Sequence, residues 1–289
     1  MNELWSKQIQ GIQTLYLSRK VRFNDLFQKE YESSFRLDKD KKLKILEIGC
    51  GPGALAAALH RWYPNAEITA IDRDSNFINF AKENHSEICF VEGDATHLPF
   101  DDDTFDVTIS NTVSEHIEPN LFYEEQKRVL KTNGVCLVLY SRTKASYPAG
   151  CLEETEFEKA FWRKLENSDD LIERYGVGKY RTNEKELPQC LKKRGFRNVE
   201  SNYVLLDLTV DNLKYPSSFV YDVINAKRMT YLESLESINP QIDGTTSQEI
   251  EKMQQIINHK FDRRIALYNK NEQQWDTDIT LIQVLRGIK

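Results

Sequence analysis

The sequence lacks the features that direct a chain to membranes or to nucleic acid. No apolar stretch approaches the roughly 18–20 residues that a helix needs to cross a bilayer, and residues 1–10 show no basic start followed by an apolar run. Lysine and arginine form no long run, and the net charge is −6, whereas clustered basic residues favour nucleic acid and anionic lipid. We therefore expect a cytoplasmic protein without a secretory signal, membrane insertion or a nucleic-acid partner.

Cysteine and histidine are also scarce. The chain has five of each among 289 residues, with no C-x-x-C pair and no histidine spacing typical of metal ligands. We expect reduced thiols and no metal site. Hydrophobic residues at 40% and charged residues at 29% fit a globular protein of one large or two small domains.

Short apolar runs alternate with helical stretches between residues 43 and 140. Strands separated by helices of this length pair in parallel through right-handed crossovers, which predicts an α/β fold with a doubly wound sheet. The predicted strands are 44–48, 67–71, 88–91, 105–109 and 135–140, and the predicted helices are 54–62, 75–84 and 121–130.

The flanking segments are less regular. Residues 1–40 predict an N-terminal helical cap, and residues 41–289 predict the main domain. Within it, residues 141–182 are rich in aromatics without a clear strand and predict a lid, while 211–276 predict a helical insertion. Further expected elements are a helix at 184–193 and strands at 202–210 and 277–285.

A glycine-rich loop, L-E-I-G-C-G-P-G-A at residues 46–54, joins the first strand to the first helix. Glycine allows a tight turn and close approach of a ligand, and we expect backbone N–H groups of the loop to face the crevice. Gly49, Gly51 and Ala54 also fit the G-x-G-x-x-[G/A] pattern of dinucleotide sites, with Asp72 as the ribose-binding acid. Loop and acid together indicate an adenosine nucleoside but leave the cofactor open.

Three features favour a cationic ligand over a diphosphate. Glu47 stands two positions before Gly49, where a carboxylate repels phosphate but attracts an amino group and a sulfonium. Pro52 and Gly53 replace residues that would start a helix aimed at a diphosphate. Asp94, after the third strand, supplies a second carboxylate that can accept from an adenine amino group.

The motifs L-E-I-G-C-G-P-G, I-T-A-I-D-R-D, E-G-D-A-T-H-L-P-F and F-D-V-T-I-S-N follow one another in this order. Over residues 43–140, a third of the chain, they resemble class I S-adenosylmethionine (SAM)-dependent methyltransferases. The resemblance is greatest to the small-molecule type that includes ubiquinone/menaquinone-biosynthesis methyltransferases. It implies a Rossmann-like, mostly parallel seven-stranded sheet with an antiparallel last strand, SAM as cofactor and S-adenosylhomocysteine (SAH) as product.

The resemblance also implies roles for individual residues. Glu47, Gly49, Gly51 and Gly53 would line the methionine part of the cofactor, and Asp72 would hold the ribose hydroxyls.

On the adenine side, Arg73 would lie beside the ring, and Asp94 with the backbone of Ala95 would meet its amino group. Asn111 would lie near the methionine end and the acceptor. Arg19, on an N-terminal helix that closes over the cofactor, would meet the methionine carboxylate. Each of these residues could instead have a purely structural role. Arg19 could belong to a solvated basic face, and Asn111 or Asp94 could be turn residues.

The predicted function is transfer of a methyl group from SAM to a small-molecule acceptor by in-line displacement. His116 is a candidate general base because its usual pKa lies near neutrality, with Glu115 as a second candidate; His116 could equally cap the next helix. Two alternative functions are an NAD-dependent oxidoreductase and a non-catalytic interaction protein that retains the fold. The insertion at 211–276 departs from the family pattern, so the identity of the methyl acceptor stays undecided. The insertion could also mediate a homodimer.

Overall fold

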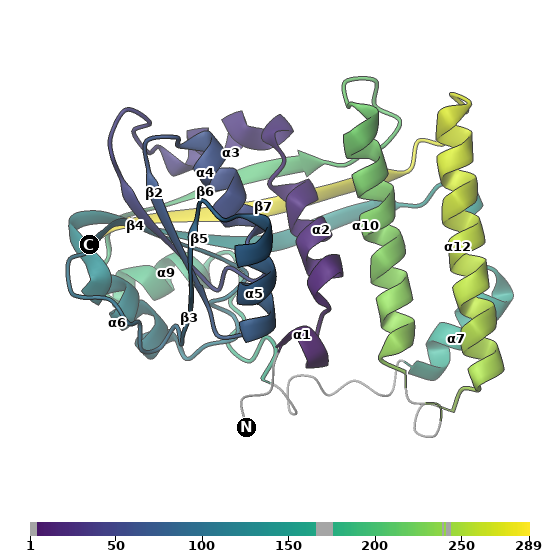
Figure 1. The fold of residues 1–289 in the computed structure, drawn as a ribbon, viewed down its shortest axis with the longest axis horizontal. Helices are drawn as coiled ribbons and strands as arrows, with labels where there is room; N and C mark the ends of the chain where they lie inside the picture. Colours follow the sequence, from purple (N-terminus) through teal and green to yellow (C-terminus); the bar gives the residue numbers. More distant parts are fainter. Residues whose placement is uncertain (1–4, 166–175, 239, 241–243) are drawn as a thin grey trace. The chain divides into compact units, whose positions relative to one another are not determined.

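The computed structural model describes residues 5–165, 176–238, 240 and 244–289 (Figure 1). Its sheet has seven strands in the order β3-β2-β1-β4-β5-β7-β6. The first five strands are β1 (Lys44–Ile48), β2 (Glu67–Asp72), β3 (Cys89–Glu92), β4 (Phe105–Asn111) and β5 (Leu130–Tyr147). They pair in parallel, while β7 (Thr277–Ile288) runs antiparallel to its neighbours, as Figure 1 shows. The predicted Rossmann-like fold is confirmed.

Strand order reverses between β1 and β4, which are neighbours in the sheet although β2 and β3 lie between them in sequence. In open α/β sheets this point leaves a crevice at the carboxyl ends of the strands, where ligands bind. Ile45, Leu46 and Ile48 of β1 are fully buried. The apolar run that predicted this strand therefore also fixes the centre of the sheet.

Helices follow the central strands as the sequence predicts. They are α4 (Ala54–Trp62), α5 (Ser75–Asn84), α6 (Pro119–Val129) and α9 (Glu186–Lys193). The Asp74 carboxylate accepts from the backbone N–H of Asn76 at 2.9 Å and caps α5, satisfying one of the orphan donors of a helix start.

The later strands differ from the prediction. β5 begins at Leu130 and continues to Tyr147, so it enters the segment that was expected to lack a strand. β6 (Arg197–Asp207) begins five residues before the predicted 202. Its first residues are mostly exposed, so no apolar alternation marks them, and backbone pairing along the sheet extends the strand. Asn111 is the last residue of β4 rather than a residue beyond it.

The N-terminal segment is helical but broken into four pieces. These are α1 (Trp5–Gln8), α2 (Ile12–Arg22), a 3-10 helix (Asp25–Phe27) and α3 (Gln28–Phe35). The Asn24 side chain accepts from Leu26 N at 3.1 Å and starts the 3-10 turn. Tyr31 of α3 is fully buried and stacks on Trp62 of α4 at 5.4 Å between ring centroids, which ties this segment to the core.

The chain divides into two compact units. The first comprises residues 1–143, 172–206 and 281–289, and contains the glycine loop. The second comprises 144–171 and 207–280, with helices α7 (Glu156–Leu165), α10 (Ser217–Glu236) and α12 (Ser247–Asn269). In the described part of the chain, no helix has both the length and the apolar character of a membrane span. The division at residue 40 and a dimer through the helical insertion stay predictions.

The second unit contains a buried charge cluster. Arg264 of α12 is fully buried, and its Nη2 lies 2.8 Å from Asp211 Oδ1 and 2.6 Å from Asp276 Oδ1. The other oxygen of Asp211 accepts from the backbone N–H groups of Gln274 and Trp275 at 2.6 and 2.7 Å. One guanidinium therefore holds together three segments that are distant in sequence.

Candidate functional site

The glycine loop hydrogen-bonds to itself and to β2. Gly49 N and Cys50 N donate to Ile71 O at 2.8 and 3.0 Å, and Gly53 N donates to Cys50 O at 3.1 Å. Gly51 N donates to Asp72 Oδ2 at 2.8 Å, and proline at position 52 has no N–H. These four N–H groups are therefore engaged within the protein. A diphosphate needs free N–H donors and finds none between residues 49 and 53.

Two of the three glycines are required by packing inside the protein. Gly49 has φ +71°, and a Cβ there would lie 2.4 Å from Val113 Cγ2. At Gly53, with φ +88°, it would lie 2.9 Å from the Phe90 ring. Gly51 has φ +52°, and its nearest neighbour would be the flexible end of Leu15 at 3.2 Å. Gly51 is thus the glycine over which α2 passes.

A Gly49→Ala variant is expected to lose about 2–5 kcal/mol of unfolding free energy, from left-handed strain plus overpacking against Val113. Gly51→Ala, with similar strain and a looser contact, should lose about 1–2 kcal/mol. Urea unfolding of both variants measures the difference. Adding Val113→Ala should recover part of the loss at position 49 but not at 51; equal losses in the two glycine variants would contradict the clash.

Glu47 of β1 lies just before this loop and is 2% exposed. Its Oε2 has no hydrogen-bond partner in the described part of the chain, and its carboxyl accepts from the backbone N–H of Ala56. Burial, and then the nearby charge of Asp72, raise the pKa of Glu47 well above its usual value. A ligand cation with N–H donors would satisfy this oxygen and favour its charged form.

Asp72 ends β2 and faces the same loop. Its Oδ2 accepts from Gly51 N at 2.8 Å and its Oδ1 from Asp74 N at 2.9 Å. Burial raises the pKa of Asp72 despite these two bonds. Each carboxylate oxygen can accept more than one hydrogen bond, so ribose hydroxyls can still donate to it. Arg73, the next residue, is exposed.

Asp94 follows β3 and is exposed. Its Oδ1 accepts from both the backbone N–H and the hydroxyl of Thr96, at 2.8 and 2.7 Å. This carboxylate therefore stabilises its own turn, which contains Ala95, and it does so through Oδ1. Asp72 and Asp94 follow neighbouring strands, so both lie on the carboxyl side of the sheet.

Helices α1 and α2 cover the crevice. The backbone N–H of Ser6 donates to Asp74 Oδ2 at 2.6 Å, and Arg19 Nη2 donates to Thr112 Oγ1, just after β4, at 3.2 Å. Burial, and then the charge of Arg22, lower the pKa of Arg19 to about 9. Arg19 is thus a half-buried cation beside the end of β4. The sequence gives no direct signal for Thr112 or Val113, whose side chains contact Arg19 and Gly49 from a distant part of the chain.

Glu115 and His116 follow the carboxyl end of β4, and Tyr140 lies within β5. Glu115 is 9% exposed, and its Oε1 lies 3.5 Å from His116 Nε2. The backbone carbonyl of Glu115 accepts from Tyr180 N at 2.9 Å. In the described residues no cluster of three or more metal-binding side chains occurs.

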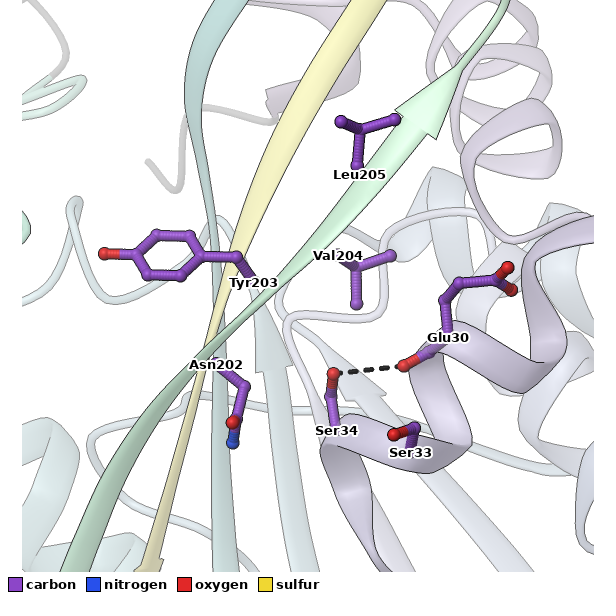
Figure 2. Close-up of a pocket in the computed structure, with 7 residues that line it drawn as sticks. All are labelled: Glu30, Ser33, Ser34, Asn202, Tyr203, Val204 and Leu205. Carbon is purple, nitrogen blue, oxygen red and sulfur yellow. Dashed lines mark hydrogen bonds between the residues drawn. The ribbon is translucent and has the colours of Figure 1, made fainter.

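A separate cavity of about 510 Å³ lies between α3 and β6 (Figure 2). None of the candidate residues lines it, and its one carboxyl group belongs to an exposed glutamate. It therefore offers no constellation for group transfer. Its lining residues are Glu30, Ser33, Ser34, Asn202, Tyr203, Val204 and Leu205.

Part of the chain is similar to known methyltransferases. Residues 46–138 match the family model described as "Methyltransferase domain". Over 109 residues the chain is 38% identical to a fatty-acid O-methyltransferase of Mycolicibacterium smegmatis, covering 36% of this chain and 39% of that protein. Over 97 residues it is 33% identical to the demethylmenaquinone methyltransferase of Thermotoga maritima. That match covers 33% of this chain and 42% of the relative. Each match thus spans about two fifths of the relative's own length.

Solved structures share the fold at low sequence identity. A phosphoethanolamine N-methyltransferase 2 of Haemonchus contortus, solved with SAM, matches with a TM-score of 0.53 and 14% identity, covering 99% of this chain and 59% of that one. The [4+2]-cyclase SpnF matches with a TM-score of 0.51 and 16% identity, covering 92% and 80%. The resemblance to class I SAM-dependent methyltransferases is confirmed for the matched region, and the fold extends beyond it.

Proposed function

We propose that this chain is a SAM-dependent methyltransferase that acts on a small-molecule acceptor. The observation that carries the proposal is the buried, unpaired carboxylate oxygen of Glu47 at the glycine loop. A buried polar atom without a partner costs roughly 1–3 kcal/mol, and the ammonium group of the methionine moiety would supply the missing donor. The match of residues 46–138 to methyltransferase domains supports the same ligand.

The residues at the crevice fit the rest of this cofactor. Arg19 would pair with the methionine carboxylate, because it is a half-buried cation that lies at the crevice and donates to Thr112 Oγ1. Asp72 would accept from the ribose hydroxyls. Asp94 with Ala95 would meet the adenine amino group, and Arg73 would lie beside the ring.

When bound, the cofactor supplies a methyl group on a sulfonium, which is already a good leaving group. The protein then has to align the acceptor with the methyl carbon and exclude water, and such alignment lowers the barrier by several kcal/mol. Asn111, the last residue of β4, would border the methionine end. Helix α2, with Leu15 over Gly51, would keep water out.

Two rival functions make different demands on this site. An NAD-dependent oxidoreductase needs loop N–H donors for a diphosphate, and those of residues 49–53 are engaged within the protein. A protein without methyltransferase activity is the other rival, and the fold match to a cyclase shows why fold likeness alone does not decide. Such a protein has no need for an unpaired carboxylate at Glu47.

Melting curves with SAM, SAH and NAD in parallel test the proposal. A ligand at about 100 times its dissociation constant adds roughly 2.7 kcal/mol of stability, so SAM and SAH should each raise the melting temperature by several degrees while NAD does not. Stabilisation by NAD alone would transfer the proposal to the oxidoreductase. Stabilisation by none of the three would favour an interaction protein.

A further inference from the structure

His116 is arranged as a hydrogen-bond donor. Its Nδ1 accepts from the backbone N–H of Gly178 at 2.8 Å, so the neutral ring carries its proton on Nε2. Burial lowers the pKa of His116, which keeps the ring neutral near pH 7. The protonated Nε2 faces Glu115 Oε1 at 3.5 Å, and Trp5 packs edge-on against the ring at 4.8 Å. Neither ring nitrogen is therefore placed to take a proton from an acceptor.

Glu115 is arranged as a hydrogen-bond acceptor. Its Oε1 lies 3.5 Å from His116 Nε2, and its Oε2 is buried. Tyr140 lies beside it, because burial, and then a side-chain hydrogen bond with Glu115, raise the pKa of Tyr140. A carboxylate has about four lone-pair sites, so Glu115 can accept from Tyr140 and still accept from a ligand.

The neighbouring cations do not neutralise Glu115. Its charge acts on Arg19, which places the carboxylate near the proposed methionine end, yet no ion pair joins them among the described side chains. Arg142 stacks on the Tyr140 ring at 3.7 Å. Its donors go to one side-chain amide and two backbone carbonyls, so they are engaged in holding the protein together.

We propose that Glu115 binds the methyl acceptor through an N–H or O–H of the nucleophile and takes its proton, which makes amines and hydroxyl compounds the acceptor class. This inference rests on the proposed methyltransferase function. In the transfer step the nitrogen or oxygen lone pair forms the new bond to the methyl carbon. The electron pair of the carbon–sulfur bond leaves with sulfur, and the acceptor proton passes to Glu115 Oε2. His116 is a positioning residue, with its Nε2 3.5 Å from Glu115 Oε1.

The same carboxylate disfavours other acceptors. A carboxylate acceptor has no proton at neutral pH and would be repelled by a buried like charge. A carbon acceptor without N–H or O–H would donate nothing to Oε2. Position 115 therefore discriminates by the chemistry of the nucleophile rather than by the shape of the rest of the molecule.

Three probes with the same alkyl chain test the proposal: octylamine, octan-1-ol and octanoate, each added to the SAH complex in melting experiments. Octylamine and octan-1-ol should raise the melting temperature of the wild-type complex more than octanoate does. Glu115→Gln should abolish this preference while binding SAH within about twofold of wild type. Glu124→Gln, which changes an exposed glutamate on α6, is the matched control and should keep the preference.

Methyl transfer from labelled SAM gives a second measurement. With any of the probes that the wild type methylates, Glu115→Gln should lower the rate by about 100-fold, as expected for loss of a general base. Equal stabilisation by all three probes, or a preference for octanoate, would overturn the proposal, as would a preference that survives in Glu115→Gln. Failure of SAH to stabilise the wild type would instead refute the methyltransferase function itself.

Discussion

A Glu47→Gln variant is expected to be more stable than the wild type without ligand and to bind SAM more weakly. Glutamine keeps an acceptor for the Ala56 N–H but carries no charge into a position that is 2% exposed. Hydrogen bonds to charged groups contribute about 1.5–3 kcal/mol, so SAM affinity should fall by roughly 10–150-fold. Calorimetric titration and ligand-free melting curves measure the two effects.

The pH dependence of both effects has a defined sign. Because the pKa of Glu47 is raised in the fold, the folded state holds a proton that the unfolded state releases above the usual carboxyl pKa. The contribution of Glu47 to stability therefore declines as pH rises from that value through the raised pKa. SAM binding through the carboxylate strengthens over the same window, and Glu47→Gln should lose both trends.

Glu67→Gln, at an exposed position on β2, is the control and should change neither stability nor affinity measurably. A Glu47→Gln chain that melts below wild type would mean that the carboxylate supports the fold. One that binds SAM with unchanged affinity would remove Glu47 from the site.

Arg264→Met should produce the largest loss of stability, about 3–5 kcal/mol, because it leaves buried carboxylates without their cation. Asp211 and Asp276 are only 5% and 3% exposed, so water solvates their carboxylates poorly. Urea unfolding measures the loss, and hydrogen exchange of α10 and α12 should show that it is concentrated in the second unit.

Lys159→Met is the matched control in the same unit. Lys159 pairs with Glu156 at 2.9 Å on the surface, and such pairs contribute roughly 0–1 kcal/mol. Adding Asp211→Asn and Asp276→Asn to Arg264→Met should restore part of the stability, because the uncompensated charges are then gone. An Arg264→Met chain as stable as Lys159→Met would show that the cluster is not needed.

The sequence predicted the central half of the sheet well because local signals are strong there. In β1, apolar residues end at a glycine loop, and α4 is an uninterrupted alanine-leucine helix. The signals fade in β6, whose first residues are mostly exposed, so only pairing with the rest of the sheet defines it. The second unit joins residues 144–171 to 207–280, a long-range association that periodicity does not encode.

The candidate site follows the same division. Glu47 and Asp72 were predicted because parallel strands bring their carboxyl ends to one edge. The placement of strand ends does not distinguish the roles of two residues that are adjacent in sequence. Glu115 and His116 are adjacent, and only the bond from Gly178 N to His116 Nδ1 shows which of them donates and which accepts. Likewise, the need for glycine at position 49 arises from Val113, sixty-four residues away.

The position of α1 and α2 over the crevice has a consequence for the rate of turnover. Leu15 lies over Gly51, Ser6 donates to Asp74, Arg19 donates to Thr112, and the Tyr16 ring packs against Phe80. A ligand reaches Glu47 only when these helices move away, and lid motions of this kind take microseconds to milliseconds. Exchange of SAH for SAM would then be the slowest step of turnover, and methyl transfer would be faster.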